Sequence, residues 1–242
     1  RKRADLRPYT ARVESAPWHV ARACSVAGFV RFVLLSRVKA MGPAPGAGDL
    51  SERDSTQPDD AYGYSKWRAE QQLQAEFADH SMAVVIVRPA LVYGDSAKGN
   101  LALLAKGVAA GLPRPPAIGA RSMVALDDLV DLLCIVAEAP VQGLATWIVT
   151  DGQQYSTRRV YDYLRRVSGK GVARAWLPVA AWRLAAALLD CRPGGATETT
   201  WDKLFGTELY SNQSVLEETS WRPRHSLETL TGDGMPAVER PQ

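Results

Sequence analysis

Two side chains with complementary chemistry, Tyr62 and Lys66, lie four positions apart in this sequence. In a helix, residues four apart stand one above the other on the same face. A tyrosine hydroxyl has a pKa of about 10, and a neighbouring cation favours the phenolate, so the pair could do acid/base chemistry near neutral pH. The same spacing also fits a lysine stem that packs past a core tyrosine, so further motifs are needed.

The segment around this pair has the pattern of a helix with one buried face. Pro58 and the two acids after it are residue types that favour a helix start. Further along the chain, the stripe that carries the pair becomes apolar, with Ala69, Leu73 and Phe77. We therefore predict a helix over residues 59–79, with the Tyr62 and Lys66 side chains facing inward.

The composition is that of an ordinary globular protein: 242 residues, 46% hydrophobic, 23% charged and a net charge of +3. This length suits either one α/β domain or one domain with a small appendage, and so small a net charge favours no nucleic-acid partner. Three scattered cysteines, without metal or redox spacing, suggest the reducing cytoplasm. Because no apolar run is long enough to span a bilayer, we also expect no membrane partner.

The order of the predicted elements indicates a doubly wound parallel sheet. Continuous apolar runs predict buried strands, and helical periodicity predicts helices between them. The strands are expected at residues 29–36, 82–89, 121–126 and 146–150. The helices are expected at residues 9–27, 59–79 and 100–110. A further helix, capped by Asp127 or Asp128, should run to about residue 138. Two amphipathic helices and an irregular tail should follow residue 156. Ligands of such sheets bind beyond the carboxyl ends of the strands, here residues 36–42 and 88–94.

Several ordered motifs together resemble a known family. They are Tyr62-Gly63-x-Ser65-Lys66, Arg88-Pro89-x-x-Val92-Tyr93-Gly94, Lys98-Gly99-Asn100, Arg121-Ser122-x-Val124 and Trp221-Arg222-Pro223. The sequence is similar to the extended short-chain dehydrogenase/reductases, and especially to the NAD-dependent epimerase/dehydratases of nucleotide sugars, of the UDP-sugar 4-epimerase type. The resemblance implies a Rossmann-like domain at residues 1–95 and 121–150, and a small, mostly helical substrate-binding portion at 96–120 and 151–242. It also implies NAD as cofactor and a homodimer formed through helices 9–27 and 59–79.

The resemblance also implies roles for individual residues. Tyr62 would be the catalytic acid/base and Lys66 would hold the ribose hydroxyls of NAD. The segment that would line the nicotinamide is Pro89, Ala90, Leu91 and Val92. Asn100 and Arg121 would contact the substrate diphosphate; their structural alternatives are an N-cap for Asn100 and an ion pair with Asp127 for Arg121.

The serine that hydrogen-bonds the reacting hydroxyl in this family is the least certain match. Ser36, at the end of the strand, is the candidate. Counting back from Gly42 instead puts Arg37 at the family position. Adjacent strand residues point to opposite faces, so Ser36 can serve only if the register slips by one residue.

The glycine-rich loop that binds the pyrophosphate in this family is absent from this sequence. By resemblance, the sequence is expected to correspond to the part of the family fold that follows its fourth strand. We therefore expect the strand at residues 29–36 to lack a neighbour on one side, and we expect weak NAD binding by this polypeptide alone. Two other functions remain open. One is a degenerate, non-catalytic binding or dimerisation module. The other is a reductase of the same fold that acts on a hydrophobic alcohol, which the apolar stretch from Trp176 to Leu189 would permit.

Overall fold

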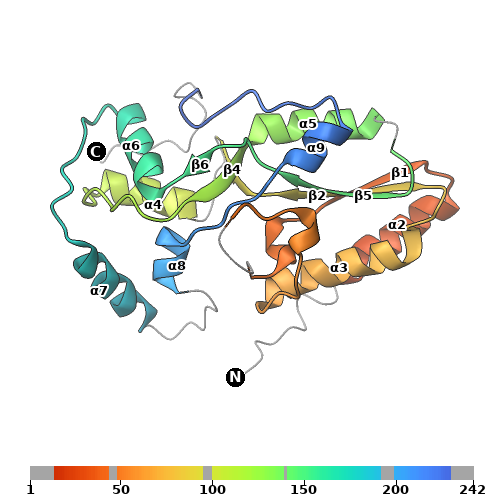
Figure 1. Cartoon of the computed structure of the whole chain (residues 1–242), viewed down its shortest axis with the longest axis horizontal. Helices are drawn as coiled ribbons and strands as arrows, with labels where there is room; N and C mark the ends of the chain where they lie inside the picture. The colour runs from red at the N-terminus through yellow and green to blue at the C-terminus, as the bar shows by residue number, and fades with distance from the viewer. Residues whose placement is uncertain (1–13, 44–47, 95–99, 139–140, 192–198, 230–242) are drawn as a thin grey trace. The chain divides into compact units, whose positions relative to one another are not determined.

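The computed structural model describes residues 14–43, 48–94, 100–138, 141–191 and 199–229 (Figure 1). The chain forms two compact units. Unit 1 consists of Arg1–Ala90, Leu129–Thr150 and Tyr210–Arg222, and unit 2 of Leu91–Asp128, Asp151–Leu209 and Pro223–Gln242. This division differs from the expected one at three places: residues 91–95 and 121–128 lie in unit 2, and residues 210–222 lie in unit 1.

Unit 1 is built on a parallel sheet, as the apolar runs predicted. Its strands are β1 (Arg31–Leu35), β2 (Ala83–Pro89) and β5 (Leu144–Val149), in the order β1-β2-β5. Every residue of β2 is buried, because this central strand is covered on both faces and paired along both edges. The Rossmann-like α/β class is thereby confirmed.

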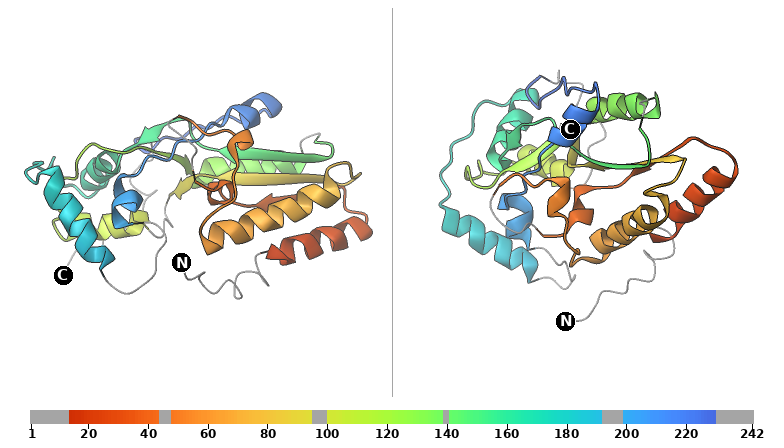
Figure 2. Two further views of the ribbon diagram at one scale, coloured as in Figure 1. Left: turned by 60° about the horizontal axis from the view of Figure 1, so that its bottom comes forward. Right: turned by 45° about the vertical axis from the view of Figure 1, so that its right-hand side comes forward.

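Helices cover both faces of this sheet. Figure 1 shows α2 (Ala16–Val26) and α3 (Ala61–Phe77) on one side, and α5 (Leu126–Glu138) and α9 (Gln213–Glu218) on the other. The views in Figure 2 agree that α2 and α3 lie side by side. The chain between β1 and α3 contains two short 3₁₀ helices, η2 (Val38–Met41) and η3 (Glu52–Asp54).

The predicted helix 9–27 begins later than expected. In the structure α2 starts at Ala16, and Pro17 lies in its first turn, where a missing N–H and a fixed φ are tolerated. Residues 9–13 lie outside the described part of the chain. The helix predicted at 59–79 is confirmed as α3, and Asp60 caps it by accepting hydrogen bonds from the backbone N–H groups of Tyr62 (3.1 Å) and Gly63 (2.9 Å).

Strand β1 is an edge strand. Among the described residues, its one partner is β2. Of its five residues only Leu34 is buried, and Phe29 and Val30 just before it are 61% and 79% exposed. The exposed apolar edge expected from the sequence is thus present in the described part of the molecule.

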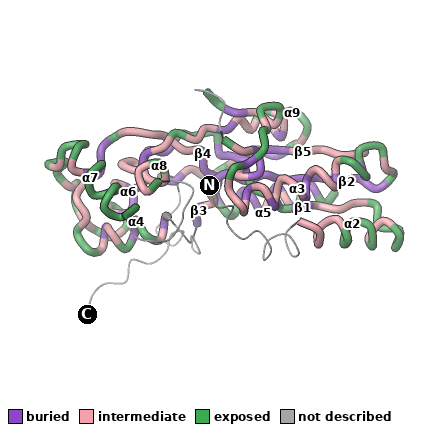
Figure 3. Tube along the Cα trace, turned by 90° about the horizontal axis from the view of Figure 1, so that it is seen from below, coloured by how far each residue is buried: buried purple, intermediate pink, exposed green. Residues whose placement is uncertain are grey.

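Unit 2 is a smaller sheet surrounded by helices. Its strands are β3 (Leu91–Tyr93), β4 (Arg121–Ala125) and β6 (Gln154–Tyr155); β3 and β4 are parallel, and β6 runs antiparallel to β4. Its helices are α4 (Asn100–Ala109), α6 (Thr157–Val167), α7 (Val179–Asp190) and α8 (Thr200–Phe205). In Figure 3 most of α7 is coloured as exposed, which agrees with the burial of only Trp182 and Ala186 on this helix.

Several sequence expectations were wrong in detail. The tail contains two short helices, α8 and α9, which tertiary packing stabilises: Phe205 of α8 and Val215 of α9 are buried. The two-residue strand β6 was missed because its partner β4 is distant in sequence. Asp127 and Asp128 do not cap α5, because the helix already begins at Leu126; Asp128 instead accepts hydrogen bonds from the backbone of Arg224 and His225.

Candidate functional site

The tyrosine and lysine of the predicted pair lie in the first two turns of α3, and both side chains are half-buried. The stripe below them, Ala69, Leu73 and Phe77, is fully buried as predicted. None of the described residues forms a hydrogen bond or ion pair with the Lys66 ammonium. The structure therefore leaves this cation available to a ligand of unit 1.

Two small residues of the same motif fix the start of α3. A Cβ added to Gly63 would lie 2.5 Å from the backbone oxygen of Lys39, so only glycine allows this turn to approach η2 so closely. Ser65 is buried, and its hydroxyl donates to the backbone oxygen of Tyr62 at 2.8 Å. Both motif residues therefore hold the turn that presents Tyr62.

A buried ion pair lies below the tyrosine and lysine on α3, and the sequence analysis missed it. Glu70, four residues after Lys66, accepts hydrogen bonds from Arg88 Nη2 (2.6 Å) and Nε (3.1 Å), and from the Ser36 hydroxyl. The Arg88 and Glu70 side chains are 3% and 0% exposed. The pair ties α3 to the carboxyl ends of β1 and β2. The sequence contained a signal for this pair: Glu70 lies on the buried face of the predicted helix, and Arg88 lies at the end of a buried strand, directly before Pro89.

Ser36 therefore already has a partner. Its side chain is buried and its hydroxyl proton is directed at Glu70, within unit 1. Its neighbour Arg37 is exposed and has an extended backbone conformation. The catalytic assignment of Ser36 stays a prediction, and the structure gives this serine a structural role.

The segment expected beside the nicotinamide follows β2. In unit 1, Pro89 ends the strand and Ala90 is buried, with its N–H donating to the backbone oxygen of Val149 at 3.0 Å. Leu91 and Val92 are half-buried in β3 of unit 2. Strand β5 holds the backbone of Pro89 and Ala90, and β4 pairs with Leu91 and Val92. The nicotinamide role itself remains a prediction.

Unit 2 contains a narrow, largely apolar pocket of about 40 Å³ that two cations line, Arg121 and Lys203. Arg121 Nη2 donates to the backbone oxygen of Asp202 at 2.7 Å, and Nη1 lies 3.6 Å from a Glu208 carboxylate oxygen. The suggested ion pair of Arg121 with Asp127 was therefore wrong, because the acidic partner is Glu208. Arg121 Nε is buried and has no partner among the described residues. The Asn100 side chain lies outside the described part of the structure.

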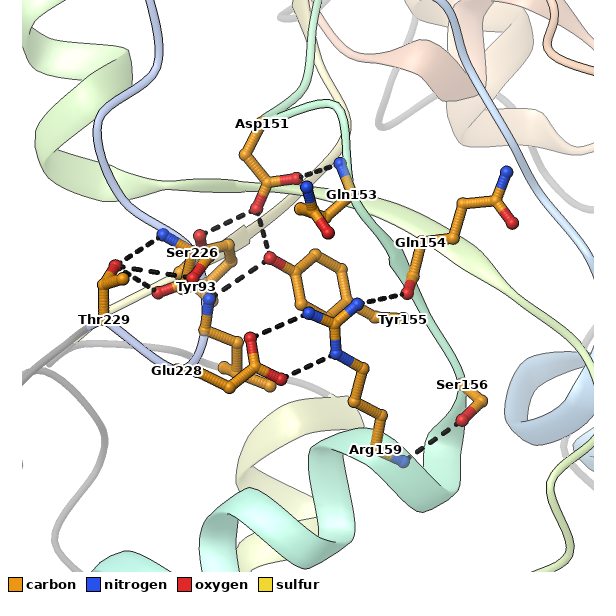
Figure 4. Close-up of polar contacts among 11 residues, drawn as sticks. Tyr93, Asp151, Gln153, Gln154, Tyr155, Ser156, Arg159, Ser226, Glu228 and Thr229 are labelled. Atoms are coloured by element: carbon orange, nitrogen blue, oxygen red, sulfur yellow. Dashed lines mark hydrogen bonds and ion pairs between the residues drawn. The ribbon is translucent and has the colours of Figure 1, made fainter.

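Tyr93, from the strand-end motif, takes part in a buried network (Figure 4). The hydroxyls of Tyr93 and Tyr155 donate to the same oxygen of Asp151, at 2.8 and 2.6 Å. Burial raises the pKa of the Asp151 carboxyl and, together with the nearby carboxylate, raises the pKa of both tyrosines well above the usual range. The Tyr155 oxygen accepts the Leu227 N–H at 3.2 Å, so this network attaches the C-terminal segment.

Metal-binding side chains do not cluster in the described part of the chain. No group of three or more metal-binding side chains is present among the described residues. Of the helices in the described ranges, none combines the length and apolar character needed to cross a membrane.

Comparison with known proteins gives a consistent result. Residues 9–149 match the NAD dependent epimerase/dehydratase family. The chain is 31% identical over 216 residues to a UDP-glucose 4-epimerase of Vibrio cholerae, an alignment that covers 87% of this chain and 63% of that protein. The chain thus spans less than two thirds of this curated relative.

Solved structures share the fold. The Bordetella bronchiseptica enzyme WbmG in complex with NAD superposes with a TM-score of 0.71 at 20% identity, covering 96% of this chain and 67% of that one. The Thermus thermophilus UDP-glucose 4-epimerase, also in complex with NAD, gives 0.63 at 20% identity, covering 93% and 68%. At this level of identity, the similarity establishes a shared fold.

Proposed function

This chain belongs to the NAD dependent epimerase/dehydratase family, and we propose that it acts, with NAD, on a nucleotide sugar in the manner of a UDP-sugar 4-epimerase. The observation that carries the proposal is the position of Tyr62 and Lys66. They are four residues apart in the first turns of one helix, half-buried, and the lysine has no partner among the described residues. We further propose that the protein works in the cytoplasm.

One donor of unit 1 fits a dinucleotide. The Lys66 ammonium on α3 has no partner among the described residues and can donate to ribose hydroxyls. Pro89, Ala90, Leu91 and Val92 would line the nicotinamide. When bound, NAD supplies the acceptor for a hydride from the sugar carbon.

In this proposal Tyr62 moves the proton. Its side-chain oxygen would take the proton of the reacting sugar hydroxyl and would later return a proton to the same oxygen of the sugar. Lys66 lies one turn further along α3, where it would hold the ribose hydroxyls of NAD beside this tyrosine. The Glu70–Arg88 ion pair holds α3 against the ends of the strands. It would thereby fix the positions of Tyr62 and Lys66 relative to the sheet.

The substrate diphosphate would bind in unit 2. Arg121 has a buried Nε without a partner in the described structure, and Lys203 lines the same pocket. Two positive charges that line one pocket attract a diphosphate, and the Nη atoms of Arg121 would exchange their contacts with Asp202 and Glu208 for phosphate oxygens. Asn100, expected from the sequence to contact the same group, belongs to this proposal as well.

A second candidate function is a non-catalytic module, and one observation favours it. The Ser36 hydroxyl is occupied by Glu70, and the exposed Arg37 stands at the position where the family carries its reacting-hydroxyl partner. Such a protein would serve through its surface, for example as a homodimer formed through α2 and α3. We propose the same dimer interface for the enzyme.

An assay with UDP-glucose, UDP-galactose and added NAD tests the proposal. Tyr62→Phe should lower kcat by about 10²–10⁴-fold, because it removes the proton acceptor. Tyr64→Phe is the matched control, since Tyr64 is a half-buried tyrosine on the same helix outside the proposed pair. Unchanged turnover in Tyr62→Phe would refute the role of Tyr62. No turnover of any UDP-sugar by the parent chain, at saturating NAD, would favour the non-catalytic module.

A further inference from the structure

Unit 2 has a second hollow on the other side of α6. It is an open groove of about 800 Å³ between α6, the turn that follows it and the C-terminal segment. The groove shares no lining residue with the pocket of Arg121. Its charged lining residues are Arg158, Arg159, Arg165, Arg166 and Lys170, with Asp162 and Glu228. Five positive and two negative side chains give the groove a net charge of +3, as large as that of the whole chain.

Both acids of the groove are already neutralised. Glu228 forms a bidentate pair with Arg159, with distances of 2.6 and 2.8 Å (Figure 4), and the hydrogen bond to this arginine lowers the pKa of Glu228. Asp162 forms a second bidentate pair with Arg114, which lies outside the groove lining, at 2.9 and 2.5 Å. Each carboxylate therefore already has an arginine that it pairs with through two hydrogen bonds, and two acids face five cations in the groove.

Of the four remaining cations, three have only neutral hydrogen-bond partners in the described structure, namely Arg158, Arg165 and Lys170, while Arg166 also interacts electrostatically with Glu228. Arg158 Nε and Arg165 Nε each donate to a backbone oxygen at 2.7 Å, those of Pro115 and Gly171. The Lys170 ammonium donates to the backbone oxygens that end α4, at 3.1 and 3.2 Å. Arg166 is exposed, with its guanidinium 5.6 Å from the Tyr163 ring centre.

These contacts orient the side chains without cancelling their charge. A backbone oxygen accepts one N–H of a guanidinium and leaves the other donors of the fork for a ligand. Four oriented cations around one hollow raise the local concentration of anions and match the oxygens of phosphate groups. From this charge balance we propose that the groove is a binding site for a ligand carrying several phosphate groups. The proposal is independent of the proposed function.

Isothermal titration calorimetry of the full chain with inorganic triphosphate is the first test. We expect saturable binding that weakens as salt is added, because the attraction is screened. Arg165→Ser/Arg166→Ser should weaken binding by about tenfold or more, since two charge-assisted contacts are lost. Arg165→Lys/Arg166→Lys, which keeps the charge, should lose less affinity for triphosphate. Melting curves will show that these surface variants fold.

Two controls locate the binding. Arg22→Ser/Arg53→Ser removes the same charge from exposed positions of unit 1 and should leave the affinity unchanged. Arg121→Ser should also leave it unchanged if triphosphate occupies the groove and not the other cationic pocket. Equal affinities of the groove variant and the unit 1 control would overturn the proposal.

A second arm distinguishes the source of the phosphate. Vesicles of phosphatidylcholine with and without a phosphoinositide are sedimented with the chain. Sedimentation that requires both the phosphoinositide and the groove arginines would assign the site to a lipid headgroup, and triphosphate binding alone would assign it to a soluble compound. Absence of both kinds of binding at low salt would overturn the proposal.

Discussion

Replacing Glu70 with alanine should destabilise unit 1 by about 3–5 kcal/mol, because it strands a buried charge. The Arg88 side chain is 3% exposed, and its Nη1 already lacks a partner in the described structure. Without Glu70, the guanidinium loses its counter-charge and three hydrogen bonds, and the Ser36 hydroxyl loses its acceptor. Domains of this kind have a total stability of about 5–15 kcal/mol, so the loss is a large part of it.

The second half of the prediction concerns the double variant. Arg88→Met removes the stranded charge, so Glu70→Ala/Arg88→Met should be much less destabilised than the sum of the single changes. A buried pair replaced by apolar side chains is often neutral in free energy. We expect a coupling energy of about 2–3 kcal/mol from the double-mutant cycle.

Urea unfolding, monitored through hydrogen exchange of the β2 amides, measures the loss of stability within unit 1. The matched control is Glu76→Ala on the same helix, which removes a surface ion pair with Arg22, whose side chain is 56% exposed, and an exposed hydrogen bond from the Trp18 indole N–H. That surface pair should contribute no more than about 1 kcal/mol. If Glu70→Ala costs as little as Glu76→Ala, or if the two single changes simply add, the reasoning about the buried pair is refuted.

Two further predictions concern local packing and pH. Gly63→Ala should lower the free energy of unfolding by about 1–3 kcal/mol, and with it the melting temperature, because the added Cβ would lie 2.5 Å from the Lys39 oxygen. A higher melting temperature, as expected for alanine at an open helix position, would show that the turn relaxes. Above the ordinary tyrosine pKa of 10.0, unfolded chains lose phenol protons that folded unit 2 retains at Tyr93 and Tyr155, where burial raises the pKa. Stability should therefore fall with rising pH by up to about 1.4 kcal/mol per pH unit for each tyrosine, and Tyr93→Phe/Tyr155→Phe should flatten this slope in alkaline unfolding curves.

Local pattern was enough to predict the elements that carry the proposed chemistry. Helix α3 is long and strongly periodic, so its start, its buried stripe and the common face of Tyr62 and Lys66 follow from spacing and capping alone. The fully apolar run of β2 likewise identified a central strand of a parallel sheet. Short elements such as β6 and α9 were missed, since two to six residues carry too little periodic signal and depend on distant partners.

The sequence by itself determined the family, the parallel sheet and the tyrosine and lysine on one helix, because each of these depends on residues near one another in the chain. Only the tertiary structure decided which charges meet. Glu70 pairs with Arg88, and Asp162 pairs with Arg114 across 48 residues. A Coulomb interaction depends on separation in space and on burial, and neither quantity is written in a spacing pattern. For that reason, the structural role of Ser36 and the unbalanced positive charge beside α6 became visible only once the chain was folded.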